Sequence, residues 1–167
     1  MKEIMNQEQL SRTLKRMTHE IIERNAKLSD IVLIGILKKG YPIAQMLKEN
    51  LKRFADVDVP CFPLDIHPYR DDVYPKNPAD LQGLDIHQKS VILVDDVLFT
   101  GRSVRAAMDA LNDHGRPNQI QLAILIDRGH RELPIRADYI GKNIPTSQHE
   151  RILVNLQDGS VFIVENE

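Results

Sequence analysis

Apolar residues recur at helical spacing near the start of the chain. Between Gln7 and about Asn25 they lie four, three and four positions apart, at Leu10, Leu14, Met17 and Ile21. This spacing predicts an amphipathic helix with one apolar side. The other side carries Arg12, Lys15, Arg16 and His19, again three or four positions apart. We therefore expect these polar side chains to lie together and to face outward.

Three later segments are apolar without interruption, and they are Ile31 to Leu37, Val91 to Val94 and Ile120 to Ile126. Such runs are typical of strands that are covered on both faces. Helical patterns separate them. One runs from Pro42 to Leu51, and the other has an apolar side of Val104, Ala107, Met108 and Leu111 and ends near Gly115. This order predicts an α/β fold, a mostly parallel twisted sheet flanked by helices, with ligands beyond the carboxyl ends of the strands.

The remaining segments predict loops and one hairpin. From Tyr69 to Leu84, charged residues, prolines and a glycine follow one another without a period, which indicates a loop or arm. The stretch from Gly141 to Thr146 is also interpreted as a loop. Near the end, Ile152 to Leu156 and Val161 to Val164 flank an Asp-Gly pair, which is typical of a C-terminal β-hairpin. The length predicts a single domain over residues 1–167.

Composition excludes several classes of protein. The formal net charge is -2, so any nucleic-acid site must be a local basic patch rather than a property of the whole chain. The one cysteine, Cys61, cannot form an internal disulfide, and no segment resembles a signal peptide or a membrane span. We therefore expect a cytoplasmic protein with no membrane partner.

The strongest chemical signal follows the second apolar run. Asp95 and Asp96 come directly after the strand, and Thr100, Gly101 and Ser103 follow where a helix begins. Backbone N–H groups and hydroxyls at a helix start bind phosphate, and glycine lets the backbone approach closely. Carboxylates one sugar away accept hydrogen bonds from ribose hydroxyls. The pattern favours a ribose 5-phosphate over the alternative that the two acids only cap a turn or hold Mg²⁺ directly.

Other phosphate motifs fit less well. The chain has no G-x-x-x-x-G-K-[ST] loop, and no G-x-G-x-x-G follows a strand, which disfavours a kinase or a dehydrogenase. The segment instead resembles the PRPP-binding motif of type I phosphoribosyltransferases. The resemblance implies that the two acids grip the ribose hydroxyls and that the loop holds the 5-phosphate. The implied PRPP- and UMP-binding residues here are Asp95, Asp96, Val97, Leu98, Phe99, Thr100, Gly101, Arg102 and Ser103.

A second resemblance narrows the family. Residues 115–146, which contain the run Asp-Arg-Gly-His-Arg-Glu-Leu-Pro from Asp127, resemble the PyrR family, and the likeness extends from about Thr13 to Val154. It implies a type I phosphoribosyltransferase-like fold with a small hood region. It also implies an enzyme that converts uracil and PRPP into UMP and pyrophosphate. Arg128 and His130 would then contact the base.

The same resemblance assigns the pyrophosphate side of the site. Lys38, Lys39 and Gly40 stand in the pyrophosphate loop, where lysine replaces an arginine that is common in the family. Arg70 would help to cover PRPP and is, with the two acids, implied to be catalytic. Mg²⁺ is the implied cofactor, held through the PRPP pyrophosphate rather than by a metal site of the protein.

The PyrR family further implies a regulatory activity. Its members bind a hairpin in pyrimidine-operon leader RNA when UMP is abundant, which favours transcription termination. The implied RNA-binding residues of the first helix are Arg12, Lys15, Arg16, His19 and Arg24. A basic stripe suits phosphate contacts. Acidic neighbours such as Glu8 and Glu23 equally permit a helix face that is merely solvated. A homodimer or a higher homo-oligomer is also implied.

Several functions stay open at this point. The first is a UMP-responsive RNA regulator with uracil phosphoribosyltransferase activity. The second is a uracil-salvage transferase that has lost RNA binding, and the third is a non-catalytic, nucleotide-sensing RNA regulator. A purine transferase is a fourth alternative, because the loop from Leu37 to Gly40 slightly resembles that of hypoxanthine enzymes.

Overall fold

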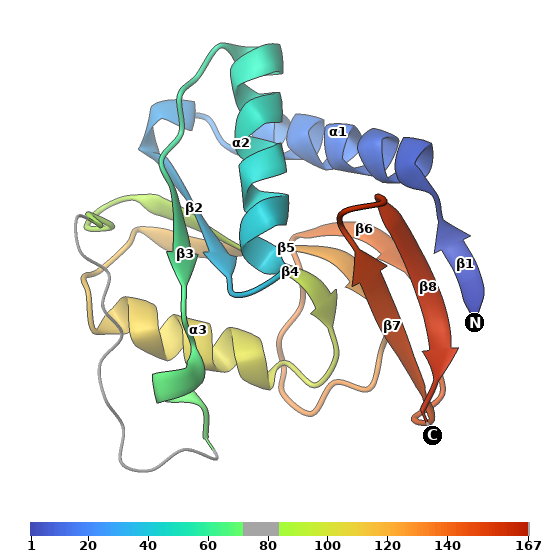
Figure 1. The fold of residues 1–167 in the computed structure, drawn as a ribbon. Helices are drawn as coiled ribbons and strands as arrows, with labels where there is room; N and C mark the ends of the chain where they lie inside the picture. Colours follow the sequence, from blue (N-terminus) through green and yellow to red (C-terminus); the bar gives the residue numbers. More distant parts are fainter. Residues whose placement is uncertain (72–83, 167) are drawn as a thin grey trace.

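The computed structural model describes residues 1–71 and 84–166 (Figure 1). Its centre is a five-stranded sheet in the order β3, β2, β4, β5, β6, in which neighbouring strands are parallel. The strands are β2 (Ile31–Ile36), β3 (Cys61–Leu64), β4 (Ser90–Leu98), β5 (Gln119–Asp127) and β6 (Tyr139–Asn143). The predicted parallel sheet is confirmed, and the three predicted strands form its middle.

Helices cover both faces of this sheet. α1 (Gln7–Arg24) and α2 (Gly40–Ala55) lie on one face, and α3 (Arg102–Asn112) lies on the other (Figure 1). Successive side chains of a strand point to opposite faces. Leu33 therefore packs toward α1 and α2, whereas Ile34 packs toward α3. The predicted helices are confirmed, and α2 is longer at both ends than its apolar pattern indicates.

A second, antiparallel sheet has the order β1, β8, β7. β7 (Glu150–Asn155) and β8 (Ser160–Glu165) form the predicted hairpin, and β1 (Lys2–Met5) pairs with β8. Asn6 then caps α1: its side chain accepts the Gln9 N–H at 2.9 Å, and its own N–H donates to the Gln9 side chain at 2.8 Å. The two ends of the chain therefore share one sheet. Two short 3₁₀ turns, η1 (Leu28–Asp30) and η2 (His67–Tyr69), complete the elements.

The edge strands of the central sheet differ from expectation. The stretch from Gly141, predicted as a loop, begins inside β6, which pairs with β5. A side chain at Gly141 would place its Cβ 2.3 Å from the Leu125 carbonyl oxygen, so this glycine allows close strand packing rather than a turn. No pattern predicts β3, which has four residues and contains Pro63 at a sheet edge, where proline is tolerated.

The predicted arm begins at Tyr69, and its residues 72–83 lie outside the described residues. Among the helices in the described part of the chain, none combines the length and the apolar character needed to cross a membrane.

Candidate active site

Three loops meet at the carboxyl ends of β2, β4 and β5. They hold residues 37–39, 99–101 and 128–138. Because neighbouring parallel strands end at the same edge of a sheet, the loops lie side by side. Two backbone hydrogen bonds join the second loop to the third, since the N–H groups of Glu132 and Leu133 donate to the Thr100 carbonyl at 2.9 and 3.2 Å. The predicted substrate residues are thereby brought to one edge.

The two predicted ribose acids lie near the end of β4 and are half-buried. Asp95 accepts the N–H of Asp96 at 2.8 Å, and Asp96 accepts the N–H of Val97 at 2.8 Å. Burial, followed by the charge of the adjacent Asp96, raises the pKa of Asp95 well above its ordinary value of 3.8. Carboxyl oxygens accept hydrogen bonds from hydroxyl groups, and the protonated form that the raised pKa of Asp95 favours can also donate one. The pair therefore suits neutral hydroxyl groups such as those of a sugar.

The predicted phosphate loop leads into the N-terminus of α3. Gly101 has a φ of +95°, a conformation that favours glycine. The N–H of Arg102 donates to the Thr100 hydroxyl at 3.3 Å, so the Thr100 side chain closes the turn. A cavity of about 310 Å³ at this helix start is lined by Arg70, Asp71, Thr100, Arg102 and Ser103. The structure thus brings the predicted cover residue Arg70 to the predicted phosphate loop.

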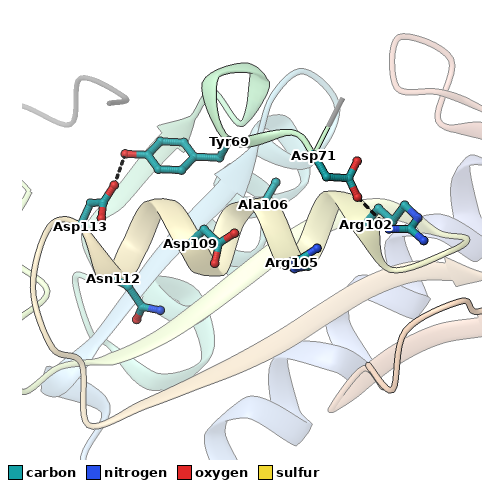
Figure 2. A pocket seen from close by; sticks show the side chains of 8 residues that line it. All are labelled: Tyr69, Asp71, Arg102, Arg105, Ala106, Asp109, Asn112 and Asp113. Atoms are coloured by element: carbon teal, nitrogen blue, oxygen red, sulfur yellow. Dashed lines mark hydrogen bonds and ion pairs between the residues drawn. The ribbon is translucent and has the colours of Figure 1, made fainter. Parts of the chain in front are cut away.

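Side-chain contacts hold η2 and the residues after it against α3 (Figure 2). Arg102 donates to Asp71 at 2.7 Å. It also donates to Glu132 at 3.0 Å. At the other end of the helix, Tyr69 donates to Asp113 at 2.7 Å. A second cavity, of about 550 Å³, lies between these two contacts along the outer side of α3. Arg102 therefore ties the start of the arm to the loop after β5.

Two glycines that flank the predicted pyrophosphate loop allow close packing, Gly35 against the start of α2 and Gly40 against β4. A Cβ on Gly35 would lie 2.3 Å from the Tyr41 Cα, and a Cβ on Gly40 would lie 2.3 Å from the Val94 carbonyl oxygen and 3.0 Å from the Asp95 Cα. Only residues without a side chain allow these approaches. The peptide bond between Leu37 and Lys38 in this loop is cis. Gly40 therefore sets the start of α2 directly against the ribose acids.

The two lysines of this loop differ in their surroundings. Lys38 is exposed at the carboxyl edge of the sheet, as expected for a pyrophosphate contact. The amine of Lys39 instead donates to the Val154 carbonyl in β7 at 2.7 Å. The paired lysines were predicted to supply two cations to the same ligand, whereas in the structure Lys39 fastens the loop to the second sheet. No sequence pattern marks a backbone carbonyl 115 residues away as its partner.

Arg128, predicted to contact the base, is buried and donates three hydrogen bonds to the protein. Its guanidinium donates to the Thr146 hydroxyl at 2.9 Å, to the Ser147 carbonyl at 3.1 Å and to the Glu150 carbonyl. It also lies over the ring of Phe99, 3.9 Å from the ring centre. These contacts bind the loop after β5 to the loop after β4 and to the start of β7. The contacts described for Arg128 are therefore with other parts of the protein.

His130 is exposed beside this cluster. Its Nε2 lies 2.5 Å from the Thr146 carbonyl oxygen, and its ring meets Phe99 edge-on at 5.9 Å between ring centres. An open cavity of about 760 Å³ is lined by Gly129, His130, Arg131, Leu133, Pro134 and Arg136. His130 is thus the more accessible of the two predicted base residues.

The predicted RNA-binding residues of α1 are exposed, but they do not form a single stripe. Arg16 donates to the carbonyls of Ile140 and Gly141 at 3.1 and 2.6 Å, and Arg24 pairs with Asp138 at 2.9 Å. These two arginines therefore attach α1 to β6 and the residue before it. Their side chains stay about half exposed, with 50% and 51% of their surface accessible.

The other three predicted residues, Arg12, Lys15 and His19, lie at two different places. Arg12 and Arg16 line a cavity of about 340 Å³ together with Lys142 of β6, a cation that the helix pattern alone does not indicate. Lys15 and His19 instead lie beside Phe54 of α2, with distances to its ring centre of 5.1 and 5.0 Å. The basic face of α1 is therefore divided between two neighbouring sites.

Comparison with known proteins places this geometry in a family. The model of the phosphoribosyl transferase domain matches residues 1–158. Curated relatives called bifunctional protein PyrR include those of Enterococcus faecalis, 55% identical over 94% of this chain and 90% of the relative, and of Streptococcus thermophilus, 53% identical over 98% and 97%. The chain belongs to the PyrR family. This membership confirms the predicted enzyme class, a uracil phosphoribosyltransferase.

Solved structures similar to this PyrR-family chain include hypoxanthine phosphoribosyltransferases. That of Trypanosoma cruzi has a TM-score of 0.76 and 19% identity and covers 100% of this chain and 98% of its own. A hypoxanthine-guanine enzyme of Bacillus anthracis has a TM-score of 0.68 and 26% identity, covering 87% and 83%. These likenesses confirm the type I phosphoribosyltransferase fold.

Proposed function

We propose that this chain transfers the ribose 5-phosphate of PRPP to uracil and that, with UMP bound, it binds a hairpin of pyrimidine-operon leader RNA and favours transcription termination. The observation that carries the first part is the position of Asp95 and Asp96 directly before a phosphate loop, whose Thr100 and Ser103 line a cavity together with Arg70. The second part rests on the basic residues of α1 and on membership of a family whose named relatives are bifunctional.

In the proposed transfer, a uracil N–H nitrogen attacks C1 of PRPP, pyrophosphate leaves, and the N–H proton is released to solvent, giving UMP. Asp95 and Asp96 accept and donate hydrogen bonds at the ribose hydroxyls, and the N-terminus of α3 holds the 5-phosphate. Positive charge develops on the ribose as the bond to pyrophosphate breaks, and the nearby carboxyl oxygens stabilise it. Most of the rate enhancement then comes from positioning the two substrates.

Mg²⁺ fits this site as part of the substrate. The ion is commonly bound by one or two carboxylates together with substrate phosphates and water. Among the described residues, no group of three or more metal-ligating side chains gathers in one place, while Asp95 and Asp96 provide a carboxylate pair. Mg²⁺ carried on the pyrophosphate would neutralise the leaving group, and Lys38 is the exposed lysine that would meet it.

The base would lie against the loop after β5. Arg128 holds that loop in shape through its bonds to Thr146 and to the carbonyls after it. Backbone groups of this ordered segment would then read the polar edge of uracil, with His130 at the mouth of the site. Phe99, 38% exposed, presents an apolar surface next to both residues.

RNA binding would use both sides of α1. The cavity that Arg12, Arg16 and Lys142 line gathers three cations, which suits backbone phosphates. Arg16 also bonds to β6, and β6 follows the predicted base loop in the chain. A nucleotide bound at the base loop would therefore be linked through β6 to the RNA-binding residues of α1. We therefore expect UMP to strengthen RNA binding.

Two measurements test the proposal. The first is turnover of uracil and PRPP by the wild type and by the variant with Asp95→Asn and Asp96→Asn, which replaces both carboxyl groups with amides at little change of volume. We expect the variant to be folded and inactive, and wild-type turnover in it would overturn the ribose assignment. Competition between uracil, hypoxanthine and guanine in the same assay tests the purine alternative.

The second measurement is the affinity for a leader hairpin, with and without UMP, across a salt series. Tight binding that UMP strengthens would support the regulator. Weak binding that UMP does not change would leave a uracil-salvage transferase, and tight binding without turnover would leave a non-catalytic regulator. Lys142→Gln should weaken binding. Lys89→Gln is the control that removes the same charge, because Lys89 directly precedes the amino end of the central strand β4, whereas Lys142 lies near the carboxyl end of the edge strand β6.

A further inference from the structure

Phe54 occupies an unusual position at the C-terminal end of α2. Its ring is half-buried and is approached by three basic side chains. The Lys15 amine lies 5.1 Å from the ring centre, the Arg53 guanidinium lies 5.2 Å from it, and the His19 ring lies 5.0 Å away at an angle of 45°. Two of these residues come from α1 and one from α2, so the cluster bridges the two helices.

Helix packing keeps this cluster in place. α1 and α2 lie side by side on one face of the central sheet (Figure 1). The Asn50 side chain of α2 donates to the Thr18 hydroxyl of α1 at 3.3 Å, one helical turn before Phe54. Lys15 and His19 are four residues apart and therefore emerge on the same side of α1. Packing of the two helices thus presents both side chains to the same aromatic ring.

The charge around the ring is positive. Two acids follow the helix, but Asp56 pairs with Lys52 at 3.0 Å and Asp58 pairs with Lys48 at 2.7 Å. Among the described residues, no ion pair joins Lys15 or Arg53 to a carboxylate, and both side chains are exposed. An aromatic ring among cations that lack acidic partners suits a ligand that has both a flat π-surface and negative charge.

We propose that Phe54 is a stacking platform for one unpaired base of the bound RNA, and that Lys15 and Arg53 contact the flanking phosphates. This inference rests on the proposed RNA binding and adds residues of α2 to it. An unpaired base stacks on an aromatic side chain, and its phosphates attract the cations beside it. Lys15 and Arg53 rest near the ring in the free protein, and their long side chains would turn toward phosphates when a base takes their place.

The cluster complements the cation site on the other side of α1. That site holds Arg12, Arg16 and Lys142 and, among the residues lining its cavity, has no aromatic ring. It therefore suits a duplex backbone, whereas the ring at Phe54 suits a loop or bulge. An RNA hairpin that lies across α1 would reach both sites, its paired stem on one side and an unpaired nucleotide on the other.

The absence of tryptophan from the chain allows a direct test. Phe54→Trp introduces a single tryptophan at the proposed platform, and stacking of a base on it quenches its fluorescence. The matched control is Phe62→Trp, because Phe62 is also partly buried but packs on the opposite face of the sheet, with the core around α3. The probe is the leader hairpin with UMP, compared with a blunt duplex of the same stem.

We expect the hairpin to quench Phe54→Trp and to leave Phe62→Trp unchanged. Phe54→Leu keeps an apolar cover but loses the ring, and should weaken hairpin binding about fivefold or more, while Phe54→Tyr restores it. Arg53→Gln should lower the salt dependence by one phosphate contact, a slope change of about 0.7, whereas Phe54→Leu should leave the slope unchanged.

The outcomes separate this inference from the proposed function. A wild type that binds the hairpin tightly, with Phe54→Leu binding equally well and Phe54→Trp unquenched, would overturn the platform and leave RNA regulation in place. Equal quenching by the blunt duplex would show a contact with paired RNA and would also overturn it. A wild type that does not bind the hairpin would remove both proposals together.

Discussion

Replacing Gly40 by alanine tests how closely the pyrophosphate loop is built against the ribose acids. The added Cβ would lie 2.3 Å from the Val94 carbonyl oxygen and 3.0 Å from the Asp95 Cα. Both atoms belong to the backbone of β4, so no flexible side chain can move aside. The first distance is roughly 1 Å short of an ordinary van der Waals contact, and α2 or β4 must shift by about that amount.

Two effects of Gly40→Ala follow from this shift. Overpacking of this kind lowers the free energy of unfolding by about 1–3 kcal/mol. A displacement of about 1 Å at a positioned catalytic group lowers the rate about a hundredfold. We therefore expect kcat/KM for PRPP to fall about a hundredfold in a protein that still folds, because the contact acts at the ribose acids and not throughout the core.

Urea unfolding and steady-state kinetics measure the two effects separately. Gly129→Ala is a useful comparison, because nothing lies within 4 Å of its added Cβ, whereas its φ of +83° disfavours a side chain. That variant should be destabilised by about 1 kcal/mol through backbone strain alone. The reasoning would be refuted if Gly40→Ala kept both the wild-type unfolding free energy and the wild-type kcat/KM.

Three further predictions concern single side chains. Because burial and Asp96 raise the pKa of Asp95, the folded state favours its protonated form, and its contribution to the unfolding free energy falls as pH rises above the ordinary value of 3.8. Asp95→Asn should therefore be more stable than wild type at neutral pH and lose that advantage in acid. Urea unfolding at several pH values checks this. A difference in unfolding free energy between variant and wild type that does not vary with pH would contradict it. Arg128→Lys keeps the charge but loses the planar fork, and should lower the unfolding free energy by about 2 kcal/mol and raise the KM for uracil; unchanged values of both would argue against a positioning role. Burial raises the pKa of the Cys61 thiol to about 11 from 9.0. Alkylation of Cys61 at pH 8 should therefore be about a hundredfold slower than that of an unperturbed thiol, and its rate should recover in urea. Rapid labelling of the folded protein would show that the thiol is not buried.

The elements that sequence reasoning predicts best are those with one dominant physical cause. β2, β4 and β5 are covered on both faces, and this leaves unbroken apolar runs in the sequence. The edge strands β3 and β6 lack that signal. The sequence predicts a loop at Gly141, whereas this glycine lies in β6 and allows the strand to approach β5 closely. A close approach of this kind depends on packing between segments and has no local signature.

In the candidate site, too, some features can be predicted from the sequence and others cannot. The ribose acids and the phosphate loop occupy consecutive positions, so their spacing predicts their arrangement. The partners of Lys39 and Arg128 are backbone carbonyls, which every residue possesses, and no residue type marks them. The same is true of Phe54, whose position beside α1 results from the packing of two helices. Contacts between distant segments therefore needed the structure.

The hairpin that closes the chain has a consequence for synthesis. Lys39 and Arg128 both donate to carbonyls of β7, and β1 pairs with β8. A ribosome delivers the N-terminal residues first. The central sheet can therefore form while β7 and β8 are still inside the ribosome, but two of the three active-site loops and the first strand must wait for them. A chain released by a stop codon before residue 150 would have its central strands but would lack the Glu150 and Val154 carbonyls that accept from Arg128 and Lys39, so the order of these two loops depends on β7.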